Sequence, residues 1–148
     1  MTGQCLCGQI KYEIKSSQKM MGICHCKNCQ RQAGSAFSTL AAVSRSDFNF
    51  TAGQPTLYSD SDTNSGNTVK RYFCGHCGSP IYSAISSKAE TLHVKAGTLD
   101  DTSGFNPQYN IWCDSKQNWV VLQDGVPEMS QGFKGTKNVT KRIDCCWC

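Results

Sequence analysis

Seven of the eleven cysteines in this chain fall into three short clusters, and that grouping limits how the chain can fold. The clusters read CLC at 5–7, CHCKNC at 24–29 and CGHC at 74–77. Thiolates a few residues apart can converge on one metal ion without a long loop to close. Four such ligands saturate a tetrahedral Zn²⁺ ion, whereas three leave one position open. Seven clustered cysteines therefore predict one closed site and one open site.

The size and composition of the chain fit a single small domain. It has 148 residues, of which 39% are hydrophobic, so a core can form but a lean one. No apolar run is long enough to span a bilayer, and the first residues lack the pattern of a secretory signal. We therefore expect a cytoplasmic protein with reduced thiols and no membrane partner. The odd number of cysteines also argues against a complete disulfide framework.

The formal net charge is +4, with basic residues concentrated before Arg45 and again near the C-terminus. A nucleic-acid-binding protein usually carries a denser basic stripe with aromatic residues between the charges. The charge pattern therefore does not favour nucleic acid as a partner. Lys27 and Arg31 differ from the other basic residues because they flank the second cysteine cluster. There they can attract a small anionic substrate.

Strand patterns dominate the sequence. Ile10, Tyr12 and Ile14 alternate with polar residues, as in a half-buried strand. Turn residues separate further apolar or β-branched runs at 37–43, 48–51, 56–58, 69–73, 80–85, 91–96 and 119–122. Only Lys27–Ala33 is typical of a short helix, next to the second cysteine cluster. The sequence predicts a mainly β domain rather than βαβ units.

The cysteine clusters also bear on domain organisation. The polar segment 59–67 is typical of a flexible surface loop, but the first and third clusters lie on either side of it. A shared metal site would make residues 5 and 77 part of one unit. We therefore expect one zinc-binding domain over 1–133, followed by a basic, cysteine-rich tail over 134–148. That tail contains Cys145, Cys146 and Cys148.

The first and third clusters match each other in their turn chemistry. Gly8 follows Cys7, and Gly78 follows Cys77. Glycine tolerates the positive φ of a tight metal-binding turn, whose N–H groups donate to the ligating sulfurs. We expect these clusters to form one structural Cys₄ site, made of Cys5, Cys7, Cys74 and Cys77.

The remaining cluster supplies Cys24, Cys26 and Cys29. A zinc ion bound by three thiolates is electron-rich, so it suits holding and activating a thiolate more than generating hydroxide. A sulfur-containing substrate follows as a hypothesis. Alternatively, the cluster is a second closed site, completed by His25, His93, Cys113 or a tail cysteine. An iron–sulfur cluster fits the same spacing.

Several segments together resemble the glutathione-dependent formaldehyde-activating enzyme family, also called the Gfa or centromere-protein-V-type domain family. They are GQCLCGQIKYEI, ICHCKNCQRQAGSAF, KRYFCGHCGSPIY, VKAGTLDD and NIWCDSKQNWVVLQDGVP. The resemblance covers 3–127. It implies a Mss4-like fold of several small antiparallel sheets around a structural zinc. It also implies two Zn²⁺ ions per chain, with Cys24, Cys26 and Cys29 holding the catalytic one.

Members of that family promote the addition of glutathione to formaldehyde, which gives S-hydroxymethylglutathione. The resemblance thus implies a carbon–sulfur lyase whose partner is a small thiol such as glutathione. Lys27, Arg31 and Arg71 are candidate contacts for the glutathione carboxylates. Gln30, Phe37 and Trp112 are candidates for the pocket wall or for core packing. The alternative function is a non-catalytic zinc-binding domain that binds a protein or nucleic acid.

Overall fold

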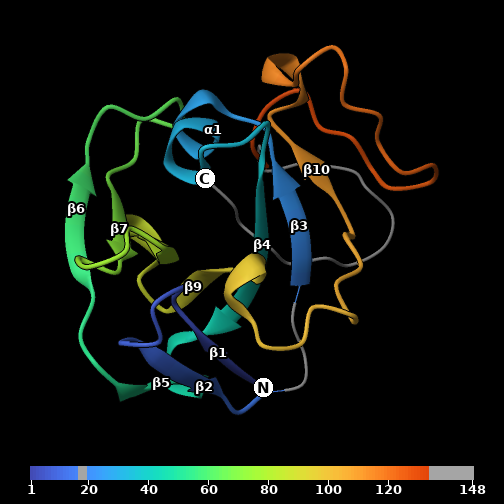
Figure 1. Ribbon diagram of the computed structural model, residues 1–148. Coiled ribbons are helices and arrows are strands. Elements are labelled where there is room, and N and C mark those ends of the chain that lie inside the picture. Colours follow the sequence, from blue (N-terminus) through green and yellow to red (C-terminus); the bar gives the residue numbers. More distant parts are fainter. Residues whose placement is uncertain (17–19, 134–148) are drawn as a thin grey trace.

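The computed structural model describes residues 1–16 and 20–133, so the expected tail at 134–148 lies outside the described residues (Figure 1). The strands are β1 (Thr2–Gln4), β2 (Lys11–Ile14), β3 (Met20–Cys24), β4 (Ser38–Ser44), β5 (Phe48–Ala52), β6 (Thr56–Asp60), β7 (Val69–Phe73), β8 (Pro80–Ile85), β9 (Thr91–Lys95) and β10 (Asn110–Ile111). The α-helix is α1 (Lys27–Ala33), and the short 3₁₀ helices are η1 (Arg45–Asp47), η2 (Ser86–Lys88), η3 (Ala96–Thr98) and η4 (Cys113–Ser115).

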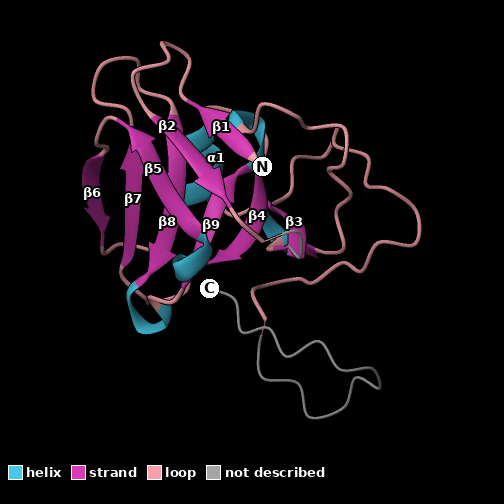
Figure 2. Ribbon diagram, turned by 90° about the horizontal axis from the view of Figure 1, so that it is seen from below, coloured by secondary structure: helices cyan, strands magenta, loops and turns pink. Residues whose placement is uncertain are grey.

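The strands form two sheets, one small and one large (Figure 2). The small sheet has the order β1-β2-β5, and the large one has the order β10-β3-β4-β9-β8-β7-β6. All neighbours run antiparallel except β10 and β3, which are parallel. The mainly β fold with a short helix at the second cysteine cluster is confirmed. We expected several small sheets, but seven of the strands form a single large sheet.

The large sheet buries both of its faces. Tyr72, Tyr82 and Val94 occupy one row across β7, β8 and β9, and their side chains share a face. Tyr82 and Val94 belong to the main hydrophobic core, and Tyr72 packs against it. Tyr12 and Ile14 of the small sheet belong to the same core. The two sheets are therefore packed face to face around it.

The opposite face of the large sheet carries polar residues in its interior. Arg71, Ser83 and His93 form the adjacent row across the same three strands, and all three are buried. Lys95, which is opposite Leu40 of β4, is buried on this face as well. Helix α1 and part of the loop after β6 line the space above it. This face forms the floor of an inner pocket.

The sequence predicts most strands of the central region, and α1 begins and ends at the expected residues. The prediction for 119–122 is wrong, because these residues form no strand and Trp119 and Val121 are 73% and 94% exposed. Strand β3 is missed because Gly22 interrupts its apolar pattern. A Cβ at Gly22 would lie 2.0 Å from the ring of Tyr109, so glycine is needed there. Within the described part of the chain, no helix has the length and apolar character needed to cross a membrane.

Candidate metal centres

The first and third clusters meet in one group of four sulfurs. The Sγ atoms of Cys5, Cys7, Cys74 and Cys77 all lie within 4.8 Å of one another. The Cys5–Cys7 and Cys7–Cys74 distances are 3.4 and 3.8 Å. Tetrahedral zinc with Zn–S bonds of about 2.3 Å requires sulfurs about 3.8 Å apart, whereas a disulfide requires about 2.05 Å. The four residues therefore fit a zinc ion.

Two tight turns bring these sulfurs together. Gly8 and Gly78 have φ values of 72° and 75°, which confirms the positive φ expected after Cys7 and Cys77. The N–H of Gly8 donates to the carbonyl of Cys5, and that of Gly78 to the carbonyl of Cys74. Because one turn precedes β2 and the other joins β7 to β8, a metal ion here would link the small sheet to the large one.

The second cluster forms a separate group of three buried sulfurs. Cys24 ends β3, Cys26 caps the N-terminus of α1, and Cys29 lies in the first turn of that helix. The Sγ atoms of Cys24 and Cys26 are 3.5 Å apart, and all three lie within 4.8 Å of one another. The N–H of Cys29 donates to the sulfur of Cys26 at 3.4 Å. These residues also fit a zinc ion, bound on one face.

Among residues 1–16 and 20–133, no further cysteine, histidine or carboxylate joins this group. His25 is fully buried, and its Nε2 lies 3.1 Å from Asn110 Oδ1. His93 lies in β9, where burial and then the positive charge of Lys95 lower its pKa to about 3. Cys113 lies in η4, outside the group. The tail cysteines, also considered as a fourth ligand, lie outside the described residues.

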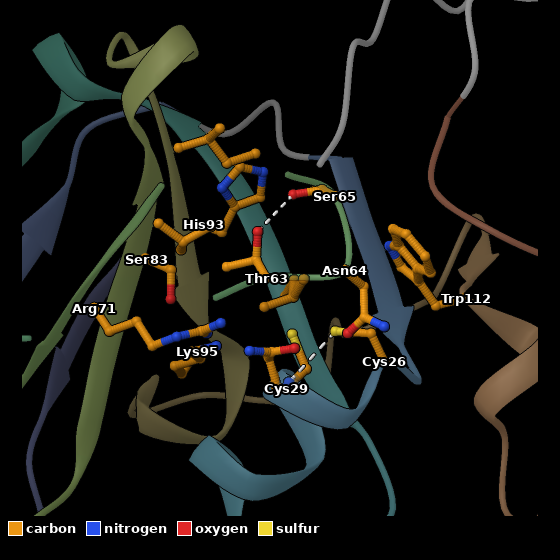
Figure 3. A pocket seen from close by; sticks show the side chains of 14 residues that line it. Cys26, Cys29, Thr63, Asn64, Ser65, Arg71, Ser83, His93, Lys95 and Trp112 are labelled. Carbon is orange, nitrogen blue, oxygen red and sulfur yellow. Dashed lines mark hydrogen bonds between the residues drawn. The ribbon is translucent and has the colours of Figure 1, made fainter. Parts of the chain in front are cut away.

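A small inner pocket adjoins the three sulfurs (Figure 3). Its volume is about 40 Å³, and its walls come from α1, the loop after β6 and the polar face of the large sheet. The lining includes Cys26, Cys29, Arg71, Ser83, Lys95 and Trp112. In Figure 3, Arg71 and Lys95 lie near Cys29, and Trp112 lies near Cys26. Trp112, a candidate for the pocket wall from the sequence, does line this pocket. Its backbone φ of 60° is unusual for a residue other than glycine.

Buried charges surround this pocket. Arg71 forms an ion pair with Asp60, with Nη2 at 2.6 Å and Nε at 2.8 Å from the same carboxylate oxygen. Lys95 Nζ donates to Ser38 Oγ at 3.1 Å. Hydrogen bonds from Cys24 and Cys26, with the positive charges of Lys95 and Arg71, hold the pKa of Cys29 well below its usual value, although burial opposes this. These surroundings therefore favour negative charge on the Cys29 sulfur in particular, whereas hydrogen bonds with Cys26 and Cys29 raise the pKa of Cys24.

Asn28 fastens the loop after β6 to the helix that carries the cysteines. Its Nδ2 donates to Asp60 Oδ2 at 3.2 Å and to the carbonyl of Asp62 at 2.8 Å. Thr63, Asn64 and Ser65 of this loop line the inner pocket. The segment 59–67, expected as a flexible surface loop, thus contains the buried Asp60 at the end of β6 and lines the inner pocket.

The expected glutathione contacts fall into two places. Lys27 and Arg31 are exposed and line a second, more open pocket of about 440 Å³ beside α1, together with Gln117 and Trp119. Arg71 is buried in the wall of the inner pocket. Gln30 also lines the outer pocket, where its Oε1 accepts hydrogen bonds from Lys27 and Gln117. The structure therefore brings Lys27 and Arg31 together and places Arg71 elsewhere.

Sequence reasoning did not identify Ser83 or Lys95 as site residues. Both lie in strands and have apolar residues on either side in the sequence. A polar residue in such an apolar strand is the one feature of the sequence that could have pointed to them. That signal is weak without the register, because only the pairing of β7, β8 and β9 brings Arg71, Ser83 and His93 into one row. The segment 59–67 was also expected only as a surface loop, whereas Thr63, Asn64 and Ser65 line the inner pocket.

Comparison with known proteins agrees with this architecture. A solved Rhodobacter sphaeroides protein, a structural genomics target, is similar over 86% of this chain and 99% of its own, with a TM-score of 0.56 and 24% identity. That likeness shows the fold. A family model described as "Glutathione-dependent formaldehyde-activating enzyme" matches residues 1–115, which include both cysteine groups and most of the inner pocket. The chain therefore belongs to the glutathione-dependent formaldehyde-activating enzyme family.

Proposed function

We propose that this protein is a zinc-dependent carbon–sulfur lyase acting on a small thiol adduct, with S-hydroxymethylglutathione as the expected adduct of glutathione and formaldehyde. The observation that carries the proposal is the three-cysteine group, which has no fourth ligand among the described residues and borders a pocket. The four-cysteine group would hold a structural ion, because a saturated zinc leaves no place for substrate.

The three-cysteine group suits a thiol substrate. A Zn²⁺ ion held by Cys24, Cys26 and Cys29 would offer a fourth position to the substrate sulfur and lower the pKa of its thiol. The small inner pocket then receives the carbon and oxygen next to that sulfur. Leu40 and Trp112 supply apolar walls, which limit the access of water to the reacting atoms.

The outer pocket suits the charged ends of glutathione. Lys27 and Arg31 place two cations on the side of α1 that faces this pocket, and cations attract the carboxylates of a tripeptide. An extended tripeptide reaches about 10 Å, which is close to the diameter of a helix with its side chains, about 10–12 Å. We therefore propose that one glutathione molecule reaches from one pocket to the other around α1. We assign its carboxylates to Lys27 and Arg31 and leave Arg71 in the inner wall.

The test is the cleavage of S-hydroxymethylglutathione to glutathione and formaldehyde by the zinc-loaded, full-length protein. We expect turnover by wild type, loss of turnover in Cys26→Ser, and retention in the control Cys113→Ser, because Cys113 lies outside both groups. An inactive wild type that is folded and holds two zinc ions would contradict the proposal. The alternative of a non-catalytic zinc-binding domain would then replace it.

The assignment of glutathione itself has its own test. We expect Arg31→Ala to raise KM for the glutathione adduct about 2- to 5-fold, because an exposed ion pair contributes about 1 kcal/mol or less. The same variant should not change KM for the hydroxymethyl adduct of 2-mercaptoethanol, which has no carboxylate. Equal effects on both substrates would contradict the assignment of Arg31.

A further inference from the structure

Trp112 has a backbone conformation that its bulky side chain disfavours. Its φ and ψ are 60° and 40°, in the left-handed region. Among residues 1–16 and 20–133, it is the one residue other than glycine with a positive φ. Such a conformation is energetically unfavourable and occurs mainly where the surrounding structure enforces it, often at functional sites. Glycine would adopt it without strain. The reason for a tryptophan at this position therefore lies in its side chain.

The left-handed turn sets the direction of the indole. Ile111 ends β10 and is fully buried in the hydrophobic cluster that contains Cys24, Cys26 and Cys29. In a continuing strand the next side chain would point to the opposite face. Trp112 instead packs against the same cluster as Ile111. The unusual backbone conformation therefore places the indole beside the three sulfurs.

Main-chain hydrogen bonds hold this conformation. The N–H groups of Trp112 and Cys113 donate to the carbonyls of Gln131 and Met129, at 3.2 and 2.9 Å. The carbonyl of Trp112 accepts a hydrogen bond from the N–H of Ser115 at 3.0 Å. Both polar main-chain groups of Trp112 are thus used, and a rotation to negative φ would break these bonds. The backbone that carries the indole is therefore fixed by its surroundings.

Trp112 forms the wall of the inner pocket beside Cys26. In Figure 3 it lies on the side of the cysteines away from Arg71, and it is the bulkiest side chain of the lining. The pocket volume of about 40 Å³ offers room for about three water-sized groups, at about 10–15 Å³ each. The wall opposite Trp112 consists of paired strands, which cannot move apart without losing their hydrogen bonds. The indole therefore limits how large a group this space accepts.

We propose that Trp112 is a specificity-determining residue, which limits the size of the group attached to the substrate sulfur. This inference rests on the proposed function. A hydroxymethyl group has one carbon and one oxygen and fits the space beside the indole, whereas a longer or branched group on the same sulfur meets the ring. An additional methylene in a closed pocket typically changes selectivity about 10- to 200-fold. Removal of the indole should therefore admit bulkier adducts while the cysteines stay in place.

The kinetic test uses the zinc-loaded, full-length protein and the ratio of kcat/KM for S-hydroxymethylglutathione to that for S-(1-hydroxypropyl)glutathione. We expect wild type to prefer the smaller adduct about 10-fold or more, and Trp112→Gly to lower this ratio by a similar factor. A wild type that accepts both adducts equally, or a ratio in Trp112→Gly within about 3-fold of wild type, would overturn the proposal.

Trp119→Gly is the matched control for the kinetic test, because it removes an indole from the outer pocket instead. Both adducts share the same glutathione portion, so a change at the outer pocket affects both and cancels in the ratio. We therefore expect Trp119→Gly to keep the ratio of wild type. The same loss of preference in both variants would show that the effect does not depend on the inner pocket, which would contradict the role of Trp112.

The second test measures binding and needs no turnover. Thiol binding to the cobalt-substituted, full-length protein is followed by the sulfur-to-metal absorption band. 2-Methyl-2-propanethiol is more branched than ethanethiol at the carbon next to sulfur. We expect wild type to bind ethanethiol more tightly by about 10-fold or more, and Trp112→Gly to bind the two thiols with similar affinity. If the preference is the same in both proteins, other residues set the size limit and the proposal is wrong.

A pair of variants separates the indole from the strained backbone. Trp112→Ala and Trp112→Gly both lack the indole, but only alanine is strained at a positive φ. We expect the folding equilibrium constant of Trp112→Ala to be about 3-fold or more below that of Trp112→Gly, measured by urea unfolding. The two variants should nevertheless show the same size preference. If the preference follows stability instead, Trp112 has only a structural role.

These measurements distinguish the role of Trp112 from the function on which it rests. If wild type does not turn over S-hydroxymethylglutathione, the proposed function fails, and the comparison of the two thiols still decides the role of Trp112. If turnover is present but the size preference is unchanged in Trp112→Gly, only the role of Trp112 fails. If Trp112→Gly does not retain two zinc ions, Trp112→Asn replaces it in both tests, because asparagine tolerates the left-handed conformation and lacks the indole.

Discussion

At the scale of single residues, Asp60 holds two parts of the inner pocket together. One of its carboxylate oxygens accepts hydrogen bonds from Arg71 of β7 and from Asn28 of α1. The side chains of Arg71 and Asp60 are only 6% and 8% exposed. Removal of one partner leaves the other charge buried and uncompensated, which is far more costly than the loss of a surface pair.

We therefore expect Asp60→Asn to lower the free energy of unfolding by about 3–5 kcal/mol. The matched control is Asp62→Asn, an exposed residue of which only the main-chain carbonyl is used. That substitution should change the free energy by about 0.5 kcal/mol or less. Urea unfolding of the zinc-loaded proteins measures both. Equal stabilities of the two variants would show that the ion pair does not support the fold.

His93 gives a second expectation at this scale, concerning pH. Burial lowers its pKa to about 3, from an ordinary value of 6.5. Between these values the unfolded chain binds one more proton than the folded chain, so stability falls as the pH is lowered through this range. One pH unit below 6.5, the proton that His93 binds in the unfolded chain lowers the free energy of unfolding by about 1.4 kcal/mol.

The measurement is urea unfolding at pH 7.5 and pH 5.5 for wild type and His93→Asn. Both proteins carry the same cysteines, so acid effects on the metal sites cancel in the comparison. We expect wild type to lose about 1.4 kcal/mol more than the variant over this interval. If both lose stability in parallel, His93 titrates normally in the folded protein.

At the scale of elements, β3 connects the fold to the candidate catalytic cysteines. It pairs with β4 and β10 and ends at Cys24. The ring of Tyr109 occupies the space that a side chain at Gly22 would need. Any residue larger than glycine at that position must displace Tyr109 or the strand itself, and Tyr109 belongs to the same hydrophobic cluster as the three cysteines.

We expect Gly22→Ala to lower the free energy of unfolding by about 1–3 kcal/mol, the usual cost of overpacking. It should also let a chelator remove one of the two zinc ions more readily. Gly97→Ala is the control, because a Cβ at Gly97 meets nothing within 4 Å. Thermal unfolding and zinc release measure the two effects. Equal behaviour of the variants would mean that β3 adjusts without affecting the cysteines.

The contrast between α1 and β3 shows how much of the fold the sequence predicts. Helix α1 carries local signals, because Cys26 starts it and Gly34, with a φ of 62°, ends it. Strand β3 has no such signal, since its place depends on Tyr109, far along the chain. Trp119 and Val121 resemble a strand locally, but nothing covers them in the described structure, and both are exposed. Local patterns were predictable, and elements defined by distant packing were not.

The candidate site divides in the same way. Ligand counting identified both groups of sulfurs, because the cysteines of each cluster are close together in the sequence. Only the first and third clusters had to be assigned to a common site. Lys95 and Ser83 reach the inner pocket through the register of strands that are distant in sequence. Arg71, like Lys27 and Arg31, was a candidate contact for the glutathione carboxylates, yet the same register places it on the interior face of the sheet.

At the scale of the whole molecule, the two cysteine groups have different positions in the fold. The four-cysteine group joins the turn before β2 to the turn between β7 and β8, and so connects the two sheets. The three-cysteine group lies within the short segment 24–29 and connects only β3 to α1. A metal ion closes a long loop in the first group and a short one in the second.

We therefore expect Cys77→Ser to destabilise the protein more than Cys29→Ser. Loss of a structural zinc removes folding free energy directly, so Cys77→Ser should lower the melting temperature strongly. Cys29→Ser should leave most of the fold intact while abolishing turnover. Thermal unfolding of the zinc-loaded variants measures the difference. Equal losses of melting temperature would contradict the division into a structural and a functional site.

The central claim is that the three-cysteine group binds the substrate sulfur. Cadmium-113 NMR of the full-length, cadmium-substituted protein tests it directly, because the chemical shift of cadmium reports how many sulfurs bind it. We predict two resonances, one typical of four sulfurs and one of three. Only the second, assigned by its loss in Cys26→Ser, should move to the four-sulfur position when glutathione is added. Two four-sulfur resonances before glutathione is added, or no movement afterwards, would contradict the account.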